Sequence, residues 1–152
     1  MGAATPTSSS DPNGTIRLTI GSRLELLSMV HALIQGISRQ YELDEETENA
    51  LLIAVIEAGT NAIQHGNVFA LEKTVTFDFT LGEKSVMVRV EDHGRGFDPS
   101  LVENPTDASN LLDPSGRGLF LMRSLMDDVS FDVRQDHGTT VRLTKTLPRP
   151  TR

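Results

Sequence analysis

Apolar and polar residues alternate in three stretches of the chain, the spacing expected of strands that bury one face. The first stretch covers residues 15–20. The other two, 75–81 and 86–90, are separated only by residues 82–84, which indicates a hairpin. Two further strands are expected near the end of the chain, joined by a turn at 136–138. The sequence thus predicts five strands, at 15–20, 75–81, 86–90, 128–134 and 139–146.

Apolar residues three and four positions apart predict helices in the intervening stretches. Three helices are expected, at about 22–40, 44–65 and 116–126. The first is expected to begin with Ser22 and Glu25 as a capping box, in which each side chain bonds a backbone N–H near the other. Asp44 is a good N-cap for the second, because its carboxylate can accept a hydrogen bond from the first turn.

The order of these elements is one strand, two helices, a hairpin, a loop, a third helix and two strands. This order is typical of an α+β fold with helices packed on one face of a sheet. The 152 residues fit one domain, expected to cover 15–147. The composition of residues 1–14 and 148–152 predicts tails that bury little apolar surface, and that of 98–114 predicts a long loop.

Charge and composition exclude several classes of protein. The chain has 21 acidic and 14 basic residues, a net charge of −7, whereas nucleic-acid surfaces are normally basic, so we expect no direct contact with nucleic acid. No cysteine is present, which excludes disulfides and thiolate metal sites. The sequence shows no run of 18 apolar residues and no signal-peptide pattern, so we expect no membrane span and a cytoplasmic location.

Glu57 and Asn61 lie four residues apart in the second predicted helix and so project from one face of it. Taken alone, such a pair usually belongs to an ordinary solvated surface. Here it is flanked by Ala50, Ala54 and Ala58, and small residues would leave room for a ligand. An amide oxygen suits Mg²⁺, and a glutamate can take a proton from an attacking hydroxyl or water. This helix face is therefore a candidate site for phosphoryl transfer.

Asp92 directly follows the strand at 86–90 and opens the motif Asp-x-Gly-x-Gly-Phe at 92–97. By itself the motif also fits simple turns. It fits a calcium loop less well, because Gly94 and Gly96 stand where oxygen ligands are needed. A carboxylate on a rigid strand end can accept a hydrogen bond from an exocyclic amine. Adenine has this amine, and guanine carries a carbonyl at the equivalent place, so the motif favours adenine.

Two further glycine motifs follow. Gly116-Arg117-Gly118 opens the third predicted helix, where unpaired N–H groups and the helix dipole suit a phosphate. Without the other motifs it could equally be a flexible hinge. Gly138 to Thr140 leads into the last strand, where a tight turn is the simpler interpretation. Taken together, the motifs make an ATP-binding protein the leading hypothesis.

In this order and spacing the motifs resemble the GHKL superfamily of ATP-binding domains, which includes histidine kinases and type II topoisomerases. Glu57–Ala62 resembles its N-box, and Gly138–Thr140 resembles its last box. Its two glycine boxes correspond to Asp92–Phe97 and Gly116–Leu119. The chain is still more similar to the small bacterial anti-sigma factor serine kinases. The stretches that carry this second resemblance are Glu57–Gly66, Asp92–Phe97 and Gly116–Val129.

The resemblance implies a two-layer α/β sandwich, the Bergerat-type ATP-binding fold, with a mixed, mostly antiparallel sheet. It implies that Asp92 binds the adenine amine, that Asn61 holds the Mg²⁺ that bridges the phosphates, and that Glu57 is the general base that activates a serine hydroxyl. Residues 98–115 would form a lid over ATP. The implied ATP-binding residues are Asn61, Asp92, Gly94, Gly96, Gly116, Arg117, Gly118, Leu119, Thr139 and Thr140.

Similar proteins form homodimers, bind a sigma factor and phosphorylate a STAS-type anti-anti-sigma protein, and the resemblance implies the same partners here. Two alternatives stay open: a nucleotide-dependent binding switch without phosphoryl transfer, and a detached catalytic module of a two-component system. Gly59 departs from the pattern, since a β-branched residue is common there in similar chains. This glycine is expected to cost the helix about 1 kcal/mol.

Overall fold

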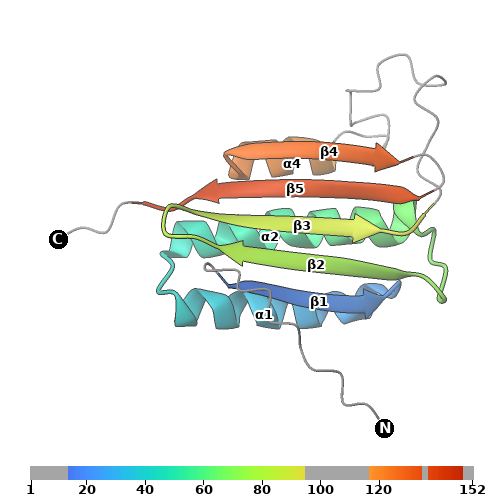
Figure 1. The fold of residues 1–152 in the computed structure, drawn as a ribbon, viewed down its shortest axis with the longest axis horizontal. Coiled ribbons are helices and arrows are strands. Elements are labelled where there is room, and N and C mark those ends of the chain that lie inside the picture. Colours follow the sequence, from blue (N-terminus) through green and yellow to red (C-terminus); the bar gives the residue numbers. More distant parts are fainter. Residues whose placement is uncertain (1–13, 95–116, 135–136, 149–152) are drawn as a thin grey trace, which may run out of the picture.

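The computed structural model describes residues 14–94, 117–134 and 137–148. A five-stranded sheet has the order β1-β2-β3-β5-β4, and every neighbouring pair is antiparallel. The three α-helices that the structure describes lie on one face of this sheet, and no described helix covers the other, open face (Figure 1). The strands are β1 (Thr15–Gly21), β2 (Thr74–Leu81), β3 (Ser85–Asp92), β4 (Asp128–Arg134) and β5 (Gly138–Thr146). The helices are α1 (Leu27–Gln40), α2 (Glu45–Asn61) and α4 (Arg117–Leu125).

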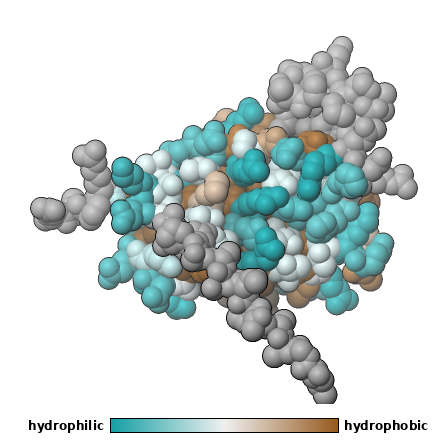
Figure 2. All heavy atoms as spheres, viewed as in Figure 1, coloured by the Kyte–Doolittle hydropathy of each residue, from teal (hydrophilic) through white to brown (hydrophobic). Residues whose placement is uncertain are grey.

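The two faces of the sheet differ in polarity because successive residues of a strand point to opposite sides. On the helix side, Phe77, Phe79 and Val88 are fully buried in the hydrophobic core. The open face is mostly hydrophilic (Figure 2). It carries, for example, the paired side chains of Arg17 and Asp78, whose closest N–O distance is 2.7 Å. An antiparallel sheet with one packed and one solvated face is common.

The first helix does not begin as expected. A short 3₁₀ turn at Leu24–Leu26 precedes α1, and no side-chain hydrogen bond caps either of them. The Ser22 hydroxyl donates instead to the backbone carbonyl of Lys73, 2.8 Å away. The predicted capping box is therefore wrong, because a tertiary hydrogen bond to the segment before β2 has taken the serine.

The start of the second helix agrees with the prediction. The Asp44 carboxylate accepts a hydrogen bond of 3.2 Å from the backbone N–H of Thr47. At its other end α2 continues directly into a π-helical segment, Ala62–Gly66, and the backbone N–H of Asn67 bonds the carbonyl of Ala62. Segments of this kind often lie at functional sites.

The alanines of α2 do not form an open ligand surface. Ala50, Ala54 and Ala58 belong to the hydrophobic core, and none is more than 3 % exposed. α2 contacts both α1 and α4, and small side chains allow this close approach. The expectation that these residues leave room for a ligand is wrong, because they make room for neighbouring helices.

The remaining fold predictions are confirmed to within a few residues at the ends of the elements. The sheet differs in one respect, since its described strands are all antiparallel rather than mixed. The tails at 1–14 and 148–152, the loop at 98–114 and the turn at 136–138 fall wholly or partly outside the described residues, so the domain boundaries stay predictions. Among the described helices, none combines the length and apolarity needed to cross a membrane.

Candidate functional site

The first turn of α4 lies against the end of α2. A Cβ atom added to Gly118, the second residue of α4, would contact Oε1 of Glu57 and would lie 3.1 Å from Nδ2 of Asn61. A glycine is therefore needed for the start of α4 to approach both side chains. Two motifs that are distant in the sequence thus form one site.

Asn61 is a buried side chain with an unmet donor. It is 3 % exposed, and its Nδ2 has no hydrogen-bond partner among the residues that the structure describes. A buried amide left in this state costs stability, so it is a natural place for a polar ligand. The start of α4 adds the positive end of a helix dipole. This combination suits an anionic ligand, and the amide oxygen of Asn61 also suits Mg²⁺.

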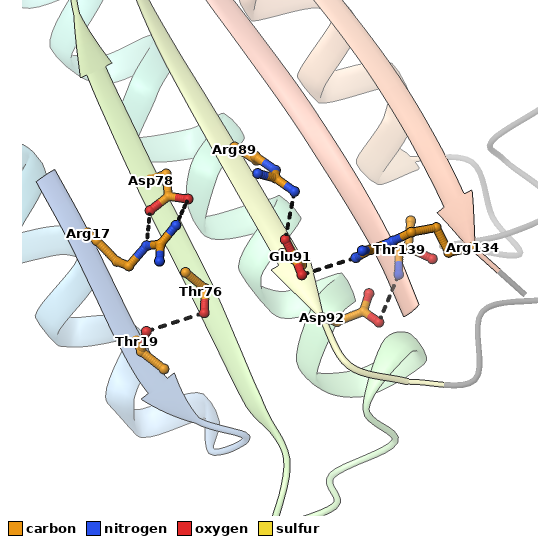
Figure 3. Close-up of polar contacts among 9 residues, drawn as sticks. All are labelled: Arg17, Thr19, Thr76, Asp78, Arg89, Glu91, Asp92, Arg134 and Thr139. Atoms are coloured by element: carbon orange, nitrogen blue, oxygen red, sulfur yellow. Dashed lines mark hydrogen bonds and ion pairs between the residues drawn. The ribbon is translucent and has the colours of Figure 1, made fainter. Parts of the chain in front are cut away.

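Asp92, the last residue of β3, is 2 % exposed. Its Oδ1 accepts hydrogen bonds from the backbone N–H groups of Gly94, at 3.0 Å, and Thr139, at 3.2 Å. The second of these bonds is visible in Figure 3. Burial raises the pKa of the Asp92 carboxyl above its ordinary value, while the two hydrogen bonds act in the opposite direction. The same two hydrogen bonds hold the carboxyl group in one orientation.

Three glycines allow the backbone to close around Asp92. A Cβ at Gly66 would contact its Oδ2, a Cβ at Gly138 would contact its backbone carbonyl, and a Cβ at Gly94 would contact the carbonyl of Gly66. Gly138 also has a φ of 102°, which side chains disfavour. The π-helical segment, the turn after β3 and the start of β5 thus meet at one carboxyl group.

The two threonines of the last box lie on opposite faces of β5. Thr139 faces the helices together with Val141 of the core and donates its backbone N–H to Asp92. Thr140 points to the open face, beside its register partner Glu91. The structure therefore brings Thr139 to the site and does not bring Thr140 there.

The other predicted site residues are only partly described. Arg117 is the exposed first residue of α4, and Leu119 is buried one position beyond Gly118. Gly96, Gly116 and the predicted lid at 98–115 lie outside the described residues.

Sequence reasoning missed Asn67, which lies just beyond the helix predicted at about 44–65. Its buried side chain bonds groups next to three different strands. These partners are far apart in the chain, so no local pattern could have singled out this residue.

A buried carboxyl at a strand end, an Asn and a Glu on the neighbouring helix, and a glycine-rich helix start define a nucleotide-binding domain of the GHKL type. Comparison with known families agrees with this class. The chain belongs to the histidine kinase-like ATPase domain family, whose model matches residues 20–145. Membership of this family implies that the chain uses a nucleotide.

Curated relatives cover most of the chain. The serine-protein kinase RsbW of Halalkalibacterium halodurans is 30% identical over 89% of this chain and 85% of its own length. The RsbW of Listeria monocytogenes is 31% identical over 86% of this chain and 85% of its own length. The anti-sigma F factor of Bacillus subtilis is 38% identical over 70% of this chain and 73% of its own length. The resemblance to GHKL proteins and to anti-sigma serine kinases is thereby confirmed.

A solved structure shares the fold. It contains the RsbU and RsbW domains of a Mycobacterium tuberculosis protein, with a TM-score of 0.67 and 20% sequence identity. The match covers 91% of this chain but only 34% of the other, so this chain spans about a third of that protein's length.

Proposed function

We propose that this protein is an ATP-dependent serine kinase that also binds a sigma factor. The observation that carries the proposal is the meeting of Glu57 and Asn61 with the start of α4, in a fold that also encloses a buried carboxyl at the end of β3. The printed names of the relatives, serine-protein kinase and anti-sigma F factor, support the same activity.

The adenine end of the nucleotide belongs at Asp92 in this proposal. Both backbone hydrogen bonds to this carboxyl end on Oδ1, so we assign Oδ2 to the exocyclic amine of adenine. A hydrogen bond that involves a charged group contributes about 1.5–3 kcal/mol, enough to prefer adenine over guanine by about tenfold or more.

The phosphate end belongs at the start of α4. The N–H groups of the first helical turn and the helix dipole favour a negative charge there. The absence of a side chain at Gly118 lets that charge approach Glu57 and Asn61. The unmet donor of Asn61 is available to a phosphate oxygen. Further residues from the predicted ATP-binding set, Gly94, Gly96, Gly116, Arg117, Leu119 and Thr139, keep the roles that the resemblance implies, whereas Thr140, on the open face of the sheet, is left out of the proposal.

Asn61 is the residue that would hold Mg²⁺, through its amide oxygen. A bound Mg²⁺ would neutralise charge on the phosphates. The site fits such an ion in its donor chemistry, because the amide oxygen of Asn61 is a hard ligand of the kind that Mg²⁺ prefers.

Glu57 would act as the general base. The serine oxygen of the partner attacks the γ-phosphorus of ATP, and the bond from that phosphorus to the bridging oxygen of ADP breaks. Glu57 takes the proton of the serine hydroxyl, so the products are phosphoserine, ADP and a protonated glutamate that later returns its proton to water. Positioning and charge stabilisation supply most of the rate in this class of reaction.

The partners proposed are a sigma factor and a STAS-type anti-anti-sigma protein that carries the acceptor serine. We also propose a homodimer, from the resemblance to anti-sigma factor serine kinases. Because phosphorylation of the anti-anti-sigma partner adds negative charge, it would change which partner the kinase holds.

The proposal is tested by Glu57→Gln, which keeps the shape of the side chain and removes its ability to accept a proton. The variant should bind Mg-ATP within about threefold of the parent and lose at least about a hundredfold in transfer of labelled phosphate to the STAS partner. Glu48→Gln is the matched control, because Glu48 lies earlier on α2 and bonds Ser38. It should phosphorylate normally.

Three outcomes separate the hypotheses. Phosphoserine on the partner, lost only in Glu57→Gln, supports the kinase. ATP binding without any label on the partner favours the nucleotide-dependent switch. Phosphoryl transfer to a histidine-containing protein, in place of the STAS protein, favours the detached module of a two-component system.

A further inference from the structure

Asn67 lies directly after the π-helical segment and is 1 % exposed. Its Nδ2 donates to the Ser22 hydroxyl at 2.8 Å and to the backbone carbonyl of Thr74 at 2.9 Å. Its Oδ1 accepts from the backbone N–H of His93 at 2.9 Å. All three of these hydrogen bonds therefore join the Asn67 side chain to other segments of the fold.

The three partners of Asn67 stand at the ends of three strands. Ser22 follows β1, Thr74 opens β2, and His93 follows Asp92 at the end of β3. Ser22 in turn donates to Lys73, so the segment before β2 is fixed from both sides. One buried amide thus links the end of β1 and the start of β2 to the backbone that follows Asp92, the proposed adenine-binding residue.

Two features connect Asn67 to the position of Asp92. The bond to the N–H of His93 fixes the peptide that immediately follows Asp92. The residue before Asn67 is Gly66, whose Cα packs against the Asp92 carboxyl so closely that a Cβ would contact Oδ2. Asn67 therefore holds both the backbone of Asp92 and the surface against which its carboxyl rests.

The backbone directly after Asn67 has an unfavourable conformation that needs surrounding contacts to hold it. Val68 and Phe69 have φ values of 51° and 57°, in the left-handed region that a β-branched residue strongly disfavours. Such conformations persist where surrounding contacts over-determine them. The backbone of Asn67 supplies such contacts, since its N–H bonds Ala62 and its carbonyl accepts from Ala70.

We propose that Asn67 is a positioning residue that sets the orientation of Asp92 and thereby the affinity and base preference of the site. The inference rests on the proposed function, because it needs a nucleotide whose base binds at Asp92. Asn67 lies ten positions beyond Glu57, about three helical turns away, so it acts on binding of the base and not on transfer of the phosphoryl group.

The test is Asn67→Ala in the full chain, with ATP and GTP binding measured by calorimetry in the presence of Mg²⁺. We expect the Kd for ATP to rise about tenfold or more, because the N–H of His93 loses its buried acceptor. The preference for ATP over GTP should fall, and kcat at saturating ATP should stay within about threefold of the parent. A role in stability alone would leave KM and base preference unchanged in the folded fraction.

Two further variants make the result decisive. Ser38→Ala removes a buried hydroxyl that donates to Glu48 at 3.0 Å, at the opposite end of α2 from Asn67. This control should leave the Kd for ATP within about twofold of the parent. Asn67→Asp keeps an oxygen that can accept from His93 and should bind ATP more tightly than Asn67→Ala. It also provides a second reading if Asn67→Ala does not fold.

The outcomes are distinguishable. The inference is overturned if the parent binds ATP and Asn67→Ala binds it equally well, or if Asn67→Asp is as impaired as Asn67→Ala. Failure of the parent to bind ATP at all would overturn the proposed function itself.

Discussion

At the scale of single residues, the Asp92 carboxyl is subject to two opposing influences. Burial disfavours its charged form and raises its pKa, while the N–H groups of Gly94 and Thr139 favour the charged form. Burial is the larger effect, so this carboxyl takes up a proton at a pH above the ordinary value for aspartate. Both its proposed role in binding adenine and its contribution to stability should therefore depend on pH.

ATP affinity should weaken as the pH falls toward the raised pKa of Asp92. Protonation converts an acceptor that the adenine amine needs into a hydroxyl, and this occurs at higher pH than for an ordinary aspartate. The measurement is the Kd for ATP against pH in the parent and in Asp92→Asn, whose amide does not titrate. The variant should bind ATP about tenfold or more weakly at neutral pH and lack this step. Titration of the phosphates of ATP affects both proteins alike, so parallel curves would contradict the assignment.

The stability effect of Asp92 has the opposite sign. Its pKa is higher in the folded protein than in the unfolded chain, so the folded state binds the proton more tightly. The ionised, buried carboxyl therefore lowers the free energy of unfolding at neutral pH. This penalty is relieved as the pH falls through the folded-state pKa toward the unfolded one.

The sequence was sufficient for residues whose motif has a local signal. Glu57 and Asn61 share a helix face by spacing alone, and Asp92 stands visibly at the end of a strand pattern. The structure brings Glu57 and Asn61 together with Gly118, and it encloses Asp92 with three other glycines. The role of Asn67 could not be predicted, because its meaning depends on partners that only the tertiary fold brings together.

At the scale of elements, α2 packs closely against α1 and β2 at Gly59. A Cβ there would lie 2.8 Å from Cδ2 of Leu27 and 2.9 Å from Cζ of Phe77, a ring that is fully buried. The sequence suggested only a loss of helix propensity at this glycine. The structure gives it a packing role, since it lets α2 lie close to β2.

Gly59→Ala should therefore destabilise the protein, although alanine is the better helix former. The gain in helix propensity is about 1 kcal/mol, whereas overpacking a core costs about 1–3 kcal/mol, so the free energy of unfolding should fall by about 1 kcal/mol. Gly36→Ala in α1 is the matched control, because nothing lies within 4 Å of its Cβ position. This control should gain about 0.5–1 kcal/mol. Urea unfolding checks both, and a gain in both would show that propensity alone decides.

Helices and strands followed from periodicity, but their ends followed from tertiary contacts. The alternation of apolar residues gave β2 and β3 almost to the residue. The cap at Ser22 failed because its hydroxyl bonds Lys73, and the π-helical form of Ala62–Gly66 left no sign in the helical spacing. The alanines of α2 were misread for the same reason, since spacing shows a face but not what packs on it.

At the scale of the whole molecule, the candidate site draws on the π-helical segment, the helix α4 and the ends of two strands, β3 and β5, that pair in the sheet. Gly66 ends the π-helical segment, Gly94 follows β3, Gly118 is the second residue of α4 and Gly138 opens β5. The order of these elements in the chain indicated the two-layer class of fold. It could not indicate that all four glycines would converge on two carboxyl groups and one amide.

A nucleotide that contacts these four elements at once should stabilise the entire fold. ATP at a hundred times its Kd adds about 2.7 kcal/mol to the free energy of unfolding, which corresponds to a rise in Tm of roughly 10 °C for a domain of this size. Thermal unfolding should show this rise with Mg-ATP and a smaller one with GTP.

Glu57→Gln should keep the thermal shift, because the general base is not needed for binding. Asp92→Asn should lose about half of the shift or more, because a Kd about tenfold weaker leaves about 1.4 kcal/mol of stabilisation at the same ATP concentration. Removal of Mg²⁺ with a chelator should reduce the shift without abolishing it, since the base still has its contact at Asp92. Equal shifts with ATP and GTP would contradict the assignment of Asp92 to adenine. A full shift in Asp92→Asn would indicate that the phosphates alone account for the affinity. The rise in Tm reports the total affinity for the ligand, so the variant is needed to assign the contact at Asp92.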